Sequence, residues 1–186
     1  METHMAIGNS ADSLSAWSDD TRRHMRFRPD GSEWLDVTVE RFASHLAQDG
    51  LRVALGYLNS QTRFRYTGAY RLSPPLLCSI EIFDRENPTV ALVAEVDMQT
   101  TYCSIVGAAK QGLAVDDAAL DERVRTHPAR EQFAAYCGVP LLGRDGEPFG
   151  TVCHFDPRPR IGTEGQLELL ERVAPLIADY VAARVG

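Results

Sequence analysis

Four cysteines are the most reactive side chains of this sequence, and their spacing limits the chemistry that they could perform. They are Cys78, Cys103, Cys137 and Cys153, and no two of them form a C-x-x-C pair. Residues 1–20 lack the apolar core of a secretory signal peptide, so we expect a cytoplasmic protein with reduced thiols. Free cysteines usually behave as small buried hydrophobic residues. We favour that interpretation over thiol catalysis and predict no catalytic residue.

Metal binding is a second chemistry that these residues could support. Cys153 and His154 are adjacent on a predicted strand, so their side chains point to opposite faces and do not bind one ion together. A set drawn from Cys103, His127, Cys137 and either Cys153 or His154 could still converge in the folded chain. Its spacing matches no zinc signature. Because histidines within or at the edge of a core are the alternative, we predict no metal site, and the sequence identifies no cofactor.

A cluster of acidic residues occupies one predicted turn, at Asp116, Asp117 and Asp121. Such carboxylates could bind a cation or accept hydrogen bonds from a ligand. The alternatives are that they cap the following turn, are solvated, or pair with nearby arginines, where exposed ion pairs contribute only about 0–1 kcal/mol each. Asp117 is retained as a candidate ligand-binding residue.

Composition argues against several classes of partner. The net charge is −7, from 26 acidic and 19 basic residues. Binding to nucleic acid phosphates or to an anionic membrane surface needs a basic face, so we predict neither nucleic acid nor membrane as a partner. No apolar run reaches the length of a membrane span. The sequence also lacks a glycine-rich phosphate loop, a Ser-His-Asp order and an H-E-x-x-H motif.

The first half of the chain predicts one helix and three strands. The helix runs over 33–48, follows Ser32 as its cap, carries an apolar stripe at helical spacing and ends at Gly50. Alternating residues predict strands over 51–57, 63–72 and 76–83, with a hairpin turn at 59–62. Three successive strands indicate an antiparallel meander. Residues 1–30 show little periodicity and are expected to form a flexible tail.

The second half predicts short elements followed by a long helix. Residues 84–100 form a mixed connection, 102–110 a short helix and 113–115 a brief strand. Strands over 133–142 and 150–155 are joined by a turn at 144–147. The last helix begins at Thr163, where Thr163 and Gln166 fit a capping box. Helices at both ends of an antiparallel sheet predict one α+β domain over 31–186.

The residues between Tyr102 and Asp156 resemble those of one family. The segments are Tyr102-Cys103-Ser104-Ile105-Val106, Thr126-His127-Pro128-Ala129-Arg130, Tyr136-Cys137-Gly138-Val139-Pro140-Leu141, Asp145-Gly146 and Phe149-Gly150-Thr151-Val152-Cys153-His154-Phe155-Asp156. Their order is similar to that of a bacterial GAF domain, and the resemblance covers about residues 33–185. It implies a PAS- and profilin-related α+β fold. In that fold, about six antiparallel strands are ordered 2-1-5-4-3-6, the terminal helices cover one face, and a ligand pocket lies on the other.

The resemblance implies a sensor function but not a particular ligand, because GAF domains serve many functions. We expect a stand-alone protein of signal transduction that binds a small molecule in a pocket under residues 84–135. The residues expected to line this pocket are Tyr102, Cys103, Asp117, His127, Phe133, Tyr136 and Cys153.

Two alternatives stay open at this point. One branch of the family reduces free methionine-R-sulfoxide with a cysteine nucleophile. The resemblance places that nucleophile near residues 125–130, where this sequence has no cysteine. The residues that bilin and cyclic-nucleotide sites require are also missing. The other alternative is a structural dimerisation module with a vestigial pocket.

The last helix carries more apolar residues than one packing face requires. One stripe consists of Leu169, Val173, Leu176 and Tyr180, and the adjacent stripe of Leu170, Ile177, Val181 and Val185. Two stripes predict contact with both the sheet and a partner, so we expect a homodimer through the terminal helices. The alternative is that both stripes are buried within one chain.

Overall fold

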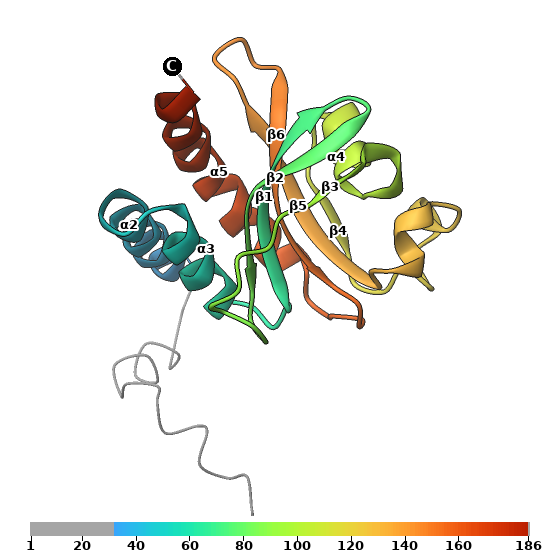
Figure 1. Ribbon diagram of the computed structural model, residues 1–186. Helices are drawn as coiled ribbons and strands as arrows, with labels where there is room; N and C mark the ends of the chain where they lie inside the picture. Colours follow the sequence, from blue (N-terminus) through green and yellow to red (C-terminus); the bar gives the residue numbers. More distant parts are fainter. Residues whose placement is uncertain (1–31, 186) are drawn as a thin grey trace, which may run out of the picture. The chain divides into compact units, whose positions relative to one another are not determined.

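The computed structural model describes residues 32–185, and the predicted tail, residues 1–30, lies outside the described residues (Figure 1). The described part contains the helices α2 (Ser32–Gln48), α3 (Leu51–Ser60), α4 (Cys103–Ala109) and α5 (Glu164–Val185). Short 3-10 turns, η2 (Met98–Thr100), η3 (Glu122–Val124) and η4 (Pro128–Glu131), lie in the middle of the chain. Within residues 32–185, no helix combines the length and apolar character that crossing a membrane requires.

Within the described residues, six strands form one antiparallel sheet. They are β1 (Tyr66–Ser73), β2 (Leu76–Asp84), β3 (Glu95–Asp97), β4 (Leu113–Val115), β5 (Ala135–Leu142) and β6 (Pro148–Asp156), in the order β3-β2-β1-β6-β5-β4. The implied order 2-1-5-4-3-6 is wrong in the place of one strand. The five strands other than β3, renumbered along the chain, follow the expected order 2-1-5-4-3. The sixth strand was expected at the edge beside β4, whereas β3 comes from the connection after β2 and pairs with β2 at the opposite edge of the sheet.

The helices divide between the two faces of the sheet (Figure 1). On one face, α3 packs against β2, where a Cβ atom at Gly56 would be 3.0 Å from Cε2 of Phe83. The start of α5 meets β5 on the same side, because the Cys137 thiol donates a hydrogen bond to the Thr163 carbonyl oxygen (3.3 Å). On the other face, α4 lies against β5 and β6. This is the layering that the resemblance implied.

The predicted strand over 51–57 is wrong, because these residues begin α3. Leu51, Ala54, Leu55 and Leu58 are buried and follow the i, i+3, i+4, i+7 spacing of a helix face. Val53, which a strand would place beside Leu51 and Leu55, is 45% exposed. The hairpin turn over 59–62 is therefore wrong as well, since these residues end the helix.

Gly50 separates α2 from α3, and it ends α2 as predicted. Its backbone φ is +87°, a conformation that glycine adopts without strain. The His45 carbonyl oxygen accepts hydrogen bonds from the amides of Asp49 (2.8 Å) and Gly50 (3.1 Å). The chain therefore turns sharply between two helices.

Helix α5 begins after Thr163 without the predicted capping box. The Thr163 hydroxyl donates to the Asp116 carboxylate instead, and the backbone amides of Gly162 and Thr163 donate to the same group. Five residues of the two α5 stripes, Leu169, Leu170, Val173, Ile177 and Val181, are buried within this chain, and Leu176 and Tyr180 are half-buried. Most of the apolar surface of α5 therefore packs inside the chain, and a dimer through this helix stays a prediction.

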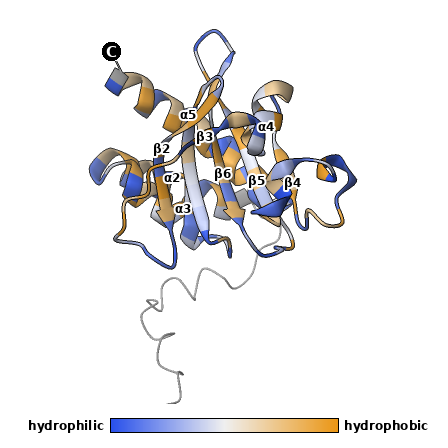
Figure 2. Ribbon diagram, turned by 45° about the vertical axis from the view of Figure 1, so that its right-hand side comes forward, coloured by the Kyte–Doolittle hydropathy of each residue, from blue (hydrophilic) through white to orange (hydrophobic). Residues whose placement is uncertain are grey.

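Apolar residues gather along the central strands and α5, whereas the tip of the β5–β6 hairpin is hydrophilic (Figure 2). The core accordingly has two parts, one between the helices and the sheet, and one between the sheet and α4. The second part includes Tyr102, Val106, Val115 and Tyr136. It surrounds the pocket described next.

Candidate functional site

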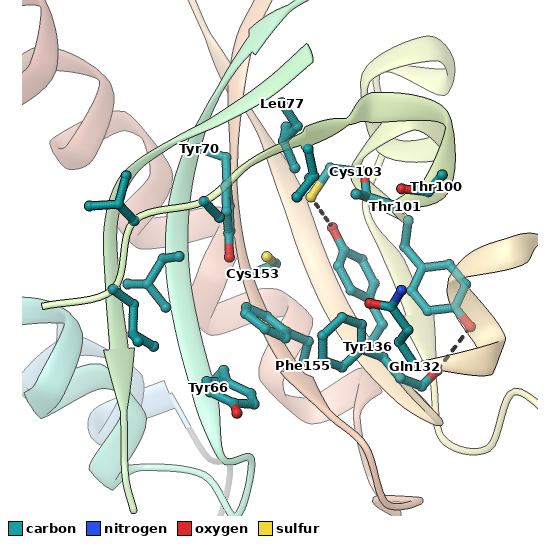
Figure 3. A pocket seen from close by; sticks show the side chains of 17 residues that line it. Tyr66, Tyr70, Leu77, Thr100, Thr101, Cys103, Gln132, Tyr136, Cys153 and Phe155 are labelled. Carbon is teal, nitrogen blue, oxygen red and sulfur yellow. Dashed lines mark hydrogen bonds between the residues drawn. The ribbon is translucent and has the colours of Figure 1, made fainter. Parts of the chain in front are cut away.

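A pocket of about 330 Å³ lies on the α4 side of the sheet (Figure 3). Seventeen described residues line it. Side chains alternate between the faces of a strand, so Tyr66 and Tyr70 of β1 and Cys153 and Phe155 of β6 face the same space. Six of the lining residues are aromatic: Tyr66, Tyr70, Tyr102, Phe133, Tyr136 and Phe155.

The pocket floor is built on three paired residues of the central strands, Gly68, Cys153 and Gly138. Cys153 of β6 pairs with Gly68 of β1 on one side and with Gly138 of β5 on the other. Tyr70 lies across Gly68, where a Cβ atom would be 2.6 Å from Cε2 of the ring. Tyr136 lies across Gly138, where a Cβ atom would be 2.3 Å from the Tyr136 Oη. The two glycines therefore make room for two phenols beside the Cys153 thiol (Figure 3).

A second thiol reaches the floor from α4. The Cys103 Sγ lies 3.5 Å from the Tyr136 Oη, within hydrogen-bond distance for sulfur. A hydrogen bond with Cys153 lowers the pKa of the Cys103 thiol, whereas burial raises the pKa of Cys153 well above its usual value. Burial also raises the pKa values of Tyr70 and Tyr136. At neutral pH the Cys153 thiol and both phenols therefore keep their protons and can donate hydrogen bonds.

Three aromatic rings form one wall. The rings of Tyr66 and Phe155 are stacked, with centroids 4.9 Å apart and planes at 14°. Phe133 meets Phe155 edge to face, at 4.9 Å and 80°. The Arg65 guanidinium carbon lies 4.7 Å from the centroid of the Tyr66 ring, but Arg65 itself does not line the pocket. The wall is therefore apolar and closely packed.

The outer wall is a segment that we call the strap, residues 85–97. Its backbone is tied to β2, since the Ser79 amide donates to the Ala94 carbonyl oxygen (2.8 Å) and the Ala94 amide to the Ser79 Oγ (2.9 Å). Val93 lines the pocket and is also 88% exposed, so the strap separates the pocket from solvent by one layer of residues. The strap side chains that line the pocket are Leu92, Val93, Ala94 and Val96.

Arg52 of α3 connects the strap to the helical face. Its guanidinium pairs with Glu81 of β2 (2.8 Å) and donates to the carbonyl oxygens of Pro88 (3.0 Å) and Val90 (2.6 Å). The residue before Arg52, Leu51, donates its amide to the Tyr180 Oη of α5 (3.3 Å). The pocket cover and the C-terminal helix are thus linked through α3.

The fold, the sheet order and this pocket can be compared with known proteins. The profile of the GAF domain family matches residues 30–181 of the chain. The chain belongs to the GAF domain family. No curated protein matches it.

Several solved structures share the fold of this GAF domain. The GAF domain of an Acinetobacter phosphoenolpyruvate-protein phosphotransferase is 14% identical, with a TM-score of 0.62 over 81% of this chain and 94% of that chain. A free methionine-R-sulfoxide reductase from Neisseria meningitidis is 15% identical, with a TM-score of 0.64 over 84% and 93%. A putative GAF sensor protein from Burkholderia vietnamiensis is 14% identical, with a TM-score of 0.62 over 81% and 95%. At these identities the likeness shows the fold alone.

The pocket of this GAF domain brings together some of the residues expected from the sequence. Tyr102, Cys103, Phe133, Tyr136 and Cys153 all line it. Whether any of them binds a ligand stays a prediction.

Asp117 and His127 do not line the pocket. The Asp117 Oδ1 accepts a hydrogen bond from the Ala119 amide (2.9 Å), so this carboxylate caps its own turn. The His127 ring stacks on the far side of Tyr102, with centroids 5.4 Å apart, and its Nδ1 accepts from the Ala129 amide (3.2 Å). Burial lowers the pKa of His127. His127 therefore packs against a residue of the pocket lining, whereas Asp117 lies outside the pocket.

The suggested metal set does not assemble. Cys137 and His154 point to the helical face, where His154 Nδ1 lies 2.7 Å from the Thr67 Oγ1. Within residues 32–185, no three His, Cys, Asp or Glu side chains are grouped so that they could hold a metal ion.

Tyr66, Tyr70 and Phe155 also line the pocket and were not expected from the sequence, whereas the strap lies within residues 84–135, which were expected to cover the pocket. A usable signal existed for two of the aromatic residues of the floor. Tyr70 follows Gly68 by two residues and Tyr136 precedes Gly138 by two, so each tyrosine shares a strand face with a residue that has no side chain.

Proposed function

We propose that this GAF domain is a sensor whose pocket binds an uncharged, largely apolar small molecule. One observation carries the proposal: none of the seventeen described lining residues is Asp, Glu, Lys, Arg or His. An anionic ligand would lose its hydration in such a pocket without gaining a positively charged partner, which costs several kcal/mol or more. Aromatic walls and a volume of about 330 Å³ suit a ligand of one or two rings.

A matched set of probes tests this proposal. Acetophenone and benzoate have nearly the same shape, but only benzoate is charged at pH 7. We expect saturation-transfer NMR to show acetophenone binding, with benzoate at least about tenfold weaker. Equal or tighter binding of benzoate would overturn the assignment of an uncharged ligand.

A blocking variant shows whether the probe sits in this pocket. Ala94→Phe fills the pocket from the strap, and Ala91→Phe places the same ring on an exposed strap residue that does not line it. Acetophenone binding should be lost in Ala94→Phe and kept in Ala91→Phe. Binding that survives in both variants would place the probe elsewhere and contradict the proposal.

A second candidate, reduction of free methionine-R-sulfoxide, is favoured by the two pocket thiols, Cys103 and Cys153. It is weakened by the lack of charged lining residues, because free methionine sulfoxide carries an ammonium and a carboxylate group. The test is turnover of methionine-R-sulfoxide with a thioredoxin system. Turnover that disappears in Cys103→Ser would establish the enzyme and replace the sensor proposal.

We infer that a ligand signal would leave the pocket through Arg52. A ligand that contacts Leu92 and Ala94 changes the stability of the strap, and the strap carbonyls are hydrogen-bonded to Arg52. Arg52 belongs to α3, which is joined to Tyr180 of α5. A ligand shifts such a system only by its difference in affinity for two strap positions. The output would therefore be a change in the terminal helices.

A homodimer through the terminal helices and a cytoplasmic location stay predictions. The exposed face of α5 carries Glu168, Glu171, Arg172 and Asp179, so a partner helix would meet charged groups. Sedimentation velocity at two salt concentrations tests the dimer, because salt screens the repulsion between two such mostly acidic faces. A monomer at both concentrations would contradict it.

A further inference from the structure

Tyr70 presents a hydroxyl that is open to the pocket and has no hydrogen-bond partner in the part of the chain that the structure describes. The residue is only 5% exposed, and its side chain lines the pocket (Figure 3). The other buried pocket tyrosines differ. The Tyr102 Oη donates to the Phe133 carbonyl oxygen (3.1 Å), and the Tyr136 Oη pairs with the Cys103 Sγ (3.5 Å). Tyr70 is thus the phenol of the three that is available to a ligand.

Packing over Gly68 does not require the Tyr70 hydroxyl, because a phenylalanine would fill the same space. The hydroxyl is open to the pocket, so a bound molecule can replace water as its hydrogen-bond partner. The hydroxyl lies beside Cys153 on the floor (Figure 3).

The polar character of the floor indicates which ligand group fits there. Burial raises the pKa of the Tyr70 phenol, so this hydroxyl keeps its proton at neutral pH and can donate a hydrogen bond, whereas the Cys153 thiol is already hydrogen-bonded to Cys103. The backbone groups of this region are engaged in the pairing of β1, β5 and β6. A ligand group that accepts a hydrogen bond therefore fits the floor, with Tyr70 as its donor.

We propose that Tyr70 is the residue that determines ligand specificity, and that the ligand is an uncharged aromatic carbonyl compound whose carbonyl oxygen accepts a hydrogen bond from Tyr70. The aromatic part packs against Phe133 and Phe155, and the carbonyl oxygen points to the floor. This inference rests on the proposed function and adds the chemical class of the ligand.

The test compares acetophenone with α-methylstyrene, which has nearly the same shape but a C=CH₂ group in place of the C=O group. One neutral hydrogen bond is worth about 0.5–1.5 kcal/mol, so the protein should bind acetophenone about twofold to tenfold more tightly. Tyr70→Phe should abolish that preference and leave the affinity for α-methylstyrene unchanged. Tyr66→Phe, at another phenol that lines the pocket, should keep the preference.

The outcomes separate the two proposals. If the two probes bind the wild-type protein equally, or if Tyr70→Phe keeps the preference, the role of Tyr70 is refuted while the uncharged pocket stands. If neither probe binds, or benzoate binds as well as acetophenone, the proposed function itself fails.

A stability measurement adds a readout that does not need a ligand. Tyr70→Phe removes an unpaired hydroxyl and should leave the thermal midpoint of the ligand-free protein equal or higher. Tyr102→Phe removes a formed hydrogen bond to the Phe133 carbonyl oxygen and should lower it. A lower midpoint for Tyr70→Phe would mean that this hydroxyl has a structural partner, which would overturn the inference.

Discussion

Acidification should destabilise this protein well before its carboxylates titrate, because of one buried histidine. His154 lies on the helical face of β6 and is fully buried. Its Nδ1 is 2.7 Å from the Thr67 Oγ1, its ring stacks on Phe64 at 5.7 Å, and its Nε2 has no hydrogen-bond partner. Burial lowers the pKa of His154 from 6.5 to about 3, and the nearby Arg85 lowers it further in the same direction.

The sign and size of the effect follow from these pKa values. Between pH 6.5 and about 3 the unfolded chain binds a proton at His154 that the folded chain does not bind. The folded state therefore has its full stability above pH 6.5 and loses about 1.4 kcal/mol for each pH unit below it. Going from pH 7 to pH 5 should cost about 2 kcal/mol of unfolding free energy at this residue.

Urea unfolding at pH 7, 6 and 5 measures this loss. His154→Asn keeps a hydrogen-bonding group near Thr67 but does not titrate, so its loss should be smaller than that of the wild type by about 2 kcal/mol. His127→Asn is the control, because His127 is only partly buried and its lowered pKa should contribute less. Equal losses in the wild type and His154→Asn would refute the reasoning. Should His154→Asn not fold, NMR titration of the wild-type imidazole decides, since a His154 ring that protonates above pH 5 contradicts it.

Three other perturbations have expected results. Gly138→Ala should cost about 1–3 kcal/mol or more in urea unfolding, because its Cβ atom would be 2.3 Å from the Tyr136 Oη, whereas Gly165→Ala, with open space around it, should cost nothing. Arg52→Ala should speed hydrogen exchange of the strap amides and leave exchange in the central strands unchanged; an unaltered strap would contradict the link. Asp84→Asn should cost about 2 kcal/mol at pH 7, because the hydrogen bond from Arg65 lowers the pKa of Asp84 to about 2; that difference should shrink below pH 4, and a constant difference would contradict it.

Local patterns predicted most of the elements, and the errors have identifiable physical causes. The residues Leu51, Val53, Leu55 and Tyr57 alternate as a strand does, yet Leu51, Ala54, Leu55 and Leu58 also fit a helix. Over only seven residues, the two-residue period of a strand and the 3.6-residue period of a helix select some of the same residues. The packing of α3 against β2 decided in favour of the helix. Tertiary contacts likewise decided the start of α5, where Asp116 from a distant loop accepts the hydrogen bond from Thr163.

The site was predicted less completely, because a pocket depends on which strands become neighbours. Cys103, Tyr136 and Cys153 were found because the family resemblance covers them. Tyr66 and Tyr70 belong to β1, whose place beside β6 is a matter of sheet order and is not encoded locally. Asp117 and His127 were expected to line the pocket because their side chains are polar. These side chains instead accept hydrogen bonds from the nearby amides of Ala119 and Ala129.

The openness of the pocket bears on whether this domain senses a ligand or only provides structure. Glycines weaken the middle of a strand, yet Gly68 and Gly138 flank Cys153 on the central strands. The tyrosines that lie over them leave about 330 Å³ of space that larger side chains on the strap could have filled. A domain kept only for dimerisation would gain stability by filling that space. An open pocket retained at that cost is what a binding site requires, so the pocket floor argues for a ligand.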